Sequence, residues 1–140
     1  MLNRFISGGG AIAAGLLISL GPRYIFRLCP PTADGGWMRC HWTGQAELGA
    51  GLLLTLLGAC LLVFSAKQTR LGLSVAVFFT ALLALLLPAA LIGGCPMETM
   101  ACRRVAFPAV TVISILTLTG FALNSFYLMG GRGKAVSVNG

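Results

Sequence analysis

Four long apolar segments, separated by short polar stretches, dominate the pattern of hydrophobic positions along this chain. A helix that crosses a bilayer needs about 20 predominantly apolar residues, and its backbone polar groups must be paired within the segment. The four segments lack the apolar–polar alternation that is typical of a membrane barrel strand. The pattern therefore predicts four membrane-spanning helices, over approximately residues 5–21, 48–66, 71–94 and 105–129.

The composition does not fit a water-soluble globular domain. The chain has 140 residues, of which 57% are hydrophobic and only 9% charged, whereas a soluble domain carries about 25% charged residues. The net charge of +7 comes from basic residues at the ends of the apolar segments, a distribution that fits lipid head groups better than nucleic acid. We expect one all-α integral membrane domain over residues 1–140, a four-helix bundle of the cell membrane whose first partner is the lipid bilayer.

The first apolar segment has a second interpretation, as a cleaved signal peptide with Arg4 as its charged start. No clear Ala-x-Ala cleavage site follows it. The continuation Pro22–Arg27 resembles an interfacial extension of a helix. We therefore favour a first membrane-spanning helix.

Small residues and prolines predict how the helices pack. Small side chains let membrane helices approach closely, and they recur every four residues in the first two segments. Pro88 predicts a kink in the third segment. Pro22 and Pro88 each precede a Cys-Pro pair by seven residues, which two related hairpins or coincidence would both explain. The small-residue stripes are Ser7, Ala11, Gly15 and Ser19 in the first segment, and Gly51, Thr55 and Ala59 in the second.

Cysteine positions decide the expected orientation, because basic residues are divided evenly between the two faces. Four of the five cysteines fall in the two loops at one face, and Cys60 lies inside the second segment, where we expect a small buried hydrophobe. Paired cysteines persist in oxidising compartments. We expect both termini in the cytoplasm and two exoplasmic loops that carry Cys29, Cys40, Cys95 and Cys102.

Several stretches of the sequence resemble an uncharacterised family of small bacterial four-helix membrane proteins. The most specific stretch is Cys40-His41-Trp42-Thr43, within Met38–Gly49. The resemblance covers nearly the whole chain and implies the four-helix fold, but it implies no established activity. The other matching stretches are Gly21-Pro22 with Ile25-Phe26 and Cys29, Arg70–Leu73, and Leu91–Cys95.

Three interpretations of the loops compete, and the first is structural disulfides. Four cysteines allow three pairings. Cys29–Cys40 with Cys95–Cys102 is the simplest, and pairs between the loops would instead tie the two hairpins together. Closing loops of this size would add about 2–4 kcal/mol to the free energy of unfolding.

The second interpretation is a soft-metal site, since Cys, Met and His suit copper(I) or zinc. Candidate ligands are Cys40, His41, Met38, Met97 and Met100. Adjacent Cys40 and His41 would need a special turn to bind one ion together, and the chain has no Cys-x-x-Cys motif.

The third interpretation is thiol–disulfide exchange with a quinone. Two cysteine pairs on the outer loops of a four-helix bundle are similar to the layout of the DsbB and vitamin K epoxide reductase families. Arg39 beside Cys40 would favour a reactive thiolate. Those families rely on a Cys-x-x-Cys pair, however, and this chain has none.

Aromatic and charged residues near the loops complete the candidate set. We expect Trp37, Trp42, Arg39 and Glu47 at the membrane interface, with Glu47 as an acid near the start of the second helix. No complete catalytic set or polar translocation path is evident. The leading hypothesis is a non-enzymatic accessory or interaction subunit without a cofactor. It would form homo-oligomers or join another membrane protein, including a transporter; the alternative is a thiol- or metal-handling membrane protein.

Overall fold

The described part of the chain forms four long helices and three short π-helical turns, denoted η. The structure, a computed structural model, describes residues 2–25, 33–37, 39–94, 96, 99 and 102–136, without the side chains of Cys102 and residues 131–136. The elements in chain order are α1 (Leu2–Leu20), η1 (Gly21–Ile25), α2 (Arg39–Val63), α3 (Lys67–Leu86), η2 (Leu87–Leu91), η3 (Cys102–Ala106) and α4 (Phe107–Val136).

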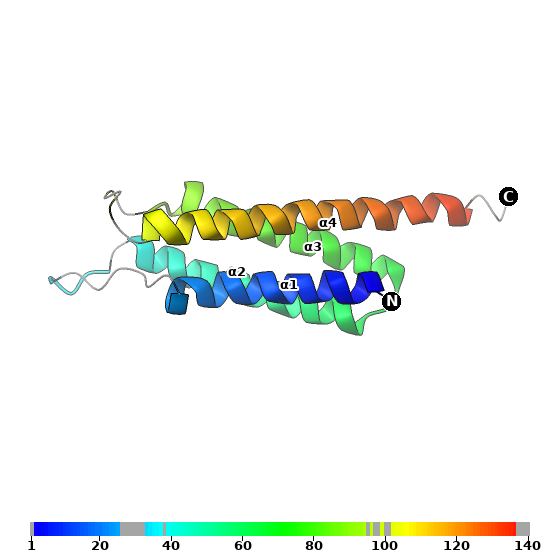
Figure 1. The fold of residues 1–140 in the computed structure, drawn as a ribbon, viewed down its shortest axis with the longest axis horizontal. Coiled ribbons are helices and arrows are strands. Elements are labelled where there is room, and N and C mark those ends of the chain that lie inside the picture. The colour runs from blue at the N-terminus through cyan, green and yellow to red at the C-terminus, as the bar shows by residue number, and fades with distance from the viewer. Residues whose placement is uncertain are drawn as a thin grey trace.

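The four helices are long and apolar enough to cross a membrane, over Leu2–Ile25, Arg39–Val63, Lys67–Leu91 and Arg103–Gly130. This confirms the prediction of an all-helical, multi-pass membrane protein. The helices run side by side, with the start of α1, the end of α4 and the α2–α3 turn at one end, and η1, η2, η3 and the start of α2 at the other (Figure 1). We call the second end the loop end. Which side of a membrane it faces remains a prediction.

The closest helix contact joins α1 to α2 through glycines. A methyl group built on Gly15 would lie 2.6 Å from the carbonyl oxygen of Gly51, and one built on Gly51 would lie 2.6 Å from that of Gly15. One heptad away, a methyl group on Gly58 would lie 2.9 Å from the carbonyl oxygen of Gly8. The two backbones therefore touch at two points, and only glycine leaves room for this approach.

Only some of the small residues expected to pack the helices make this α1–α2 contact. Ser7, Ala11, Gly15 and Ser19 are buried as expected, but Ala59 is exposed and Gly58 takes its place. An α-helix turns by about 100° per residue, so positions four apart drift by about 40°, whereas positions seven apart drift by only about 20°. The contact therefore follows Gly8 with Gly15 and Gly51 with Gly58.

The outer surface of the bundle is apolar, and several hydroxyl groups point inward. Leu56 and Phe126 expose 57% and 69% of their surface, as expected for side chains that face lipid. Inside, Thr80 and Thr117 donate hydrogen bonds of 2.8 Å and 2.7 Å to carbonyl oxygens four residues earlier. Such bonds within a helix satisfy hydroxyls where no water is available.

Two of the three π-helical turns contain a buried proline. Pro22 lies in η1 and Pro88 in η2. Proline cannot donate a backbone hydrogen bond, and a change from four-residue to five-residue spacing lets later residues pair again. After Pro88, the amide of Ile92 donates to the carbonyl of Leu87, five residues earlier, at 3.0 Å. The kink expected at Pro88 therefore takes the form of a π-helical turn.

The glycine contact generates a direct prediction. Gly51→Ala should force α1 away from α2, and overpacking of this kind reduces the free energy of unfolding by about 1–3 kcal/mol. Gly49→Ala is the matched control, because a methyl group there meets nothing within 4 Å. Thermal unfolding in detergent should show a lower Tm for Gly51→Ala than for Gly49→Ala. Equal Tm values would mean that the backbones do not touch at Gly51.

Candidate functional site

The first turns of α2 carry polar residues toward the interior of the loop end. Cys40, Thr43 and Glu47 are spaced three and four apart, which places them on one helix face. Their exposed fractions are 0%, 2% and 2%. Arg39 and Trp42, on the opposite face, are exposed. The Cys-His-Trp-Thr stretch is therefore divided between the inside and the outside of the bundle.

Thr43 ties α2 to the segment that follows η2. Its hydroxyl lies 3.0 Å from the carbonyl oxygen of Gly93 and 3.3 Å from that of Arg39, and it can donate to either. Gly93 has a φ of 73°, a left-handed conformation that glycine adopts without strain. Gly93 therefore ends the helical segment in a left-handed conformation, and Thr43 holds its carbonyl against α2.

His41 lies between two tryptophan rings. Its ring is stacked on Trp37, with centroids 4.0 Å apart and an interplanar angle of 27°. Trp42 meets the same ring edge-on, with centroids 5.9 Å apart. Both tryptophans are more than half exposed, and such amphipathic rings are enriched at membrane interfaces. Their position supports the expected interfacial role, which stays a prediction.

The described cysteines differ in state. Cys40 is buried and disulfide-bonded, whereas Cys60 in α2 is a free thiol. The candidates Cys29, Met38, Cys95, Met97 and Met100 lie outside the described residues, as does the side chain of Cys102. The disulfide pairing expected from the sequence therefore stays a prediction. Among the residues that are described, no three His, Cys, Asp or Glu side chains come together as metal ligands.

Glu47 lies deeper than the sequence indicated. The sequence placed the start of the second helix near residue 48, but α2 begins at Arg39. Glu47 is thus about 12 Å along the axis from the first residue, at a rise of about 1.5 Å per residue. Its side chain is 2% exposed, and neither carboxyl oxygen has a hydrogen-bond partner among the described residues. The favourable effect of a helix N-terminus is confined to the first turn, so it does not account for this acid.

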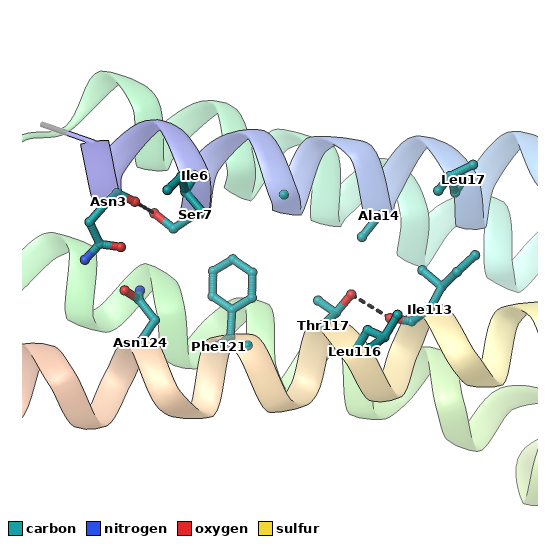
Figure 2. Close-up of a pocket in the computed structure, with 12 residues that line it drawn as sticks. Asn3, Ile6, Ser7, Ala14, Leu17, Ile113, Leu116, Thr117, Phe121 and Asn124 are labelled. Atoms are coloured by element: carbon teal, nitrogen blue, oxygen red, sulfur yellow. Dashed lines mark hydrogen bonds between the residues drawn. The ribbon is translucent and has the colours of Figure 1, made fainter.

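A second feature is an open seam between α1 and α4, which we call the α1–α4 groove (Figure 2). It has a volume of about 380 Å³. Phe121 of α4 projects into it, and Ala14 of α1 faces it from the other wall. Methyl groups built on Gly10 and Gly120, which also line the groove, would meet nothing within 4 Å. The remaining lining residues are Asn3, Ile6, Ser7, Leu17, Ile113, Leu116, Thr117 and Asn124.

Two amides stand at the end of this groove nearer the chain termini. Asn3 of α1 and Asn124 of α4 point toward one another across it (Figure 2). The side-chain amide of Asn124 donates a hydrogen bond of 2.9 Å to the hydroxyl of Ser74 in α3. The groove is therefore apolar along its length and polar at this end.

Sequence reasoning did not identify the α1–α4 groove. Neither Gly8-Gly9-Gly10 nor Asn124 was expected to line a site. Three consecutive glycines supply more than one helix face with small residues, because each successive residue turns by about 100°. The three glycines therefore indicate that α1 has a second face on which another helix can pack closely.

The states of the cysteines can be tested by differential alkylation. In denatured, unreduced protein, an alkylating reagent should modify Cys60 and leave Cys40 unmodified. After reduction both should react, and mass mapping of the unreduced peptides would identify the partner of Cys40. Alkylation of Cys40 before reduction, with Cys60 as the internal positive control, would contradict the assignment.

Comparison with known proteins identifies the family. No curated protein and no solved structure matches the chain significantly. One family does match, the domain of unknown function DUF4418, over residues 11–128. This range includes α2, α3, the second half of α1 and most of α4, so the match extends along the helical bundle and is not confined to one local motif. The chain belongs to the DUF4418 family of proteins with a domain of unknown function.

Proposed function

We propose that this protein is an accessory subunit of a membrane complex, and that the α1–α4 groove receives a transmembrane helix of another membrane protein. The observation that carries the proposal is the pair of open glycines, Gly10 and Gly120, on the walls of a groove of about 380 Å³. The four helices of the chain leave this space between them.

The chemistry of the groove favours a helix over a lipid chain as its occupant. Glycine in a helix interior costs about 1 kcal/mol relative to alanine. A flexible acyl chain packs against an alanine surface as readily as against a glycine surface. Lipid binding would therefore not offset the destabilisation of the helix by glycine. A helix does, because small residues let two backbones approach closely. The opposite face of α1 already uses Gly8 and Gly15 in this way against α2.

The loop end supplies a second support for an interaction protein. Cys40 is disulfide-bonded and 0% exposed. Thiol–disulfide exchange requires access of a thiolate to a sulfur of the disulfide, which full burial of Cys40 opposes. We therefore keep the disulfides as ties that hold the outer loops in shape for docking, and we expect no catalytic cofactor.

Site-specific crosslinking in native membranes tests this function. A photoreactive amino acid in place of Leu116, which lines the groove, should yield one main adduct. Its attached peptide should belong to a transmembrane segment of another membrane protein. The same reagent in place of Leu56 of α2, which is 57% exposed and lies outside the groove, should not yield it.

Two glycine variants make the crosslinking specific. Gly10→Leu should fill the groove and reduce the Leu116 adduct several-fold. Gly9→Leu should leave it unchanged, since Gly9 is exposed but does not line the groove. Adducts with lipid alone, or equal adducts at Leu116 and Leu56, would contradict the proposal. An adduct with a second copy of this chain would replace the proposed partner by a homo-oligomer.

A further inference from the structure

Glu47 occupies a small cavity at the loop end, between η1, α2, η2, η3 and α4. The cavity has a volume of about 10 Å³, which is room for about one water molecule. Pro22 of η1, Glu47 of α2, Pro88 of η2 and Phe107 of α4 all line it. Because the side chain of Glu47 is 98% buried, given its exposure of 2%, its carboxyl group belongs to this cavity rather than to the surface.

The surroundings provide nothing to balance an ionised carboxylate. The other residues lining the cavity are Thr43, Gly44, Ala106 and Val110, and none of the lining residues besides Glu47 carries a charge. Burial of an unpaired charge is strongly unfavourable, whereas burial of a neutral carboxyl group costs far less. Protonation of Glu47 therefore removes the free-energy cost of burying an unpaired carboxylate in this cavity.

The basic groups of the neighbouring elements lie on the outside. Arg23 of η1, Arg39 of α2, and Arg103 and Arg104 of η3 are exposed. His41 of α2 is stacked against Trp37, and η2 carries no titratable residue. The helix α4 has no charged residue between Phe107 and Met129. Among the described residues, no cation lines the cavity with Glu47.

We propose that Glu47 is a proton-binding site of the bundle, which exchanges its proton with water at the loop end. In the closed bundle the carboxyl is neutral. When it ionises, the O–H bond breaks, the electron pair stays on the carboxylate, and the proton passes to water that enters the cavity. This function is separate from the α1–α4 groove, whose lining includes neither Glu47 nor its cavity neighbours.

The helix ends around Glu47 are suited to admit that water. Three π-helical turns, η1, η2 and η3, lie at this end of the bundle. Such turns are interruptions of α-helical structure that frequently occur at functional sites. Thr43, one helical turn before Glu47, is hydrogen-bonded to Gly93 beyond η2. Opening of the loop end would begin with the loss of this contact, which lies next to Glu47. Ionisation of Glu47 should therefore loosen the loop end.

Carbodiimide labelling of the full-length wild-type protein in bilayers tests the proposal without any substitution. Hydrophobic carbodiimides react with protonated carboxyl groups in apolar surroundings. Mass mapping should find the adduct on Glu47 and not on Asp34, which is exposed, and raising the pH should suppress it. The infrared band of a protonated carboxyl group should disappear over the same pH range.

Two variants separate Glu47 from Asp34. Glu47→Gln should remove the infrared band, whereas Asp34→Asn should leave it. At alkaline pH, amide hydrogen exchange over residues 43–47 should be several-fold faster in wild type than in Glu47→Gln. At acidic pH the two proteins should exchange equally.

Three results would overturn the proposal. The first is an ionised Glu47 at acidic pH in the wild-type spectrum. The second is a carbodiimide adduct on Asp34 in place of Glu47. The third is protection of Glu47 from carbodiimide by sodium or potassium ions at constant pH, which would make the site one for a metal cation. Because all three are measured on wild type, they remain decisive if Glu47→Gln fails to fold.

Discussion

Lipid gives apolar helices no hydrophobic reason to associate, so the bundle depends on how closely its backbones can approach. The α1–α2 contact meets this requirement at two points, Gly15 with Gly51 and Gly8 with Gly58. These contacts set the register of α1 against α2 over most of the length of both helices. The position of α1 in turn determines the groove that remains between α1 and α4. The proposed docking role therefore follows from the two glycine faces of α1. The face with Gly8 and Gly15 packs against α2, whereas the face with Gly10 remains open.

The same solvent requires the polar groups inside the bundle to find hydrogen-bond partners there. Hydroxyls such as those of Thr80 and Thr117 donate hydrogen bonds to carbonyl oxygens of their own helices. The amide of Asn124 in α4 donates to the hydroxyl of Ser74 in α3. Glu47 departs from this rule, as do the hydroxyls of Ser114 and Ser125, because both its carboxyl oxygens are buried and lack a partner among the described residues. It also lies where the helices change from α- to π-helical geometry. A protonated carboxyl in a membrane bundle is consistent with both facts, and it would give the loop end a response to pH that the apolar groove lacks.

Most of the fold could be predicted from the sequence because each apolar segment is long enough to define a helix by itself. Helix ends were less predictable. The start of α2 at Arg39 lies within a polar stretch, Arg39–Glu47, that hydropathy reads as a loop, but Cys40, Thr43 and Glu47 follow the spacing of a helix face. The sequence placed Glu47 near a helix start, and the extra turns of α2 bury it. The π-helical turns at Pro22 and Pro88 could not be distinguished in advance from a helix end and a kink, since proline permits all of these outcomes.

Topology mapping tests most directly the claim that four helices cross the bilayer as two hairpins. Asp34→Cys, Thr99→Cys and Gln68→Cys each add one reporter thiol at an exposed position, before α2, before α4 and in the first turn of α3 respectively. A thiol reagent that cannot cross membranes should modify the first two from one side, and Gln68→Cys only from the opposite side. Modification of Asp34→Cys and Thr99→Cys from opposite sides would contradict the arrangement of the bundle and the shared loop end that depends on it.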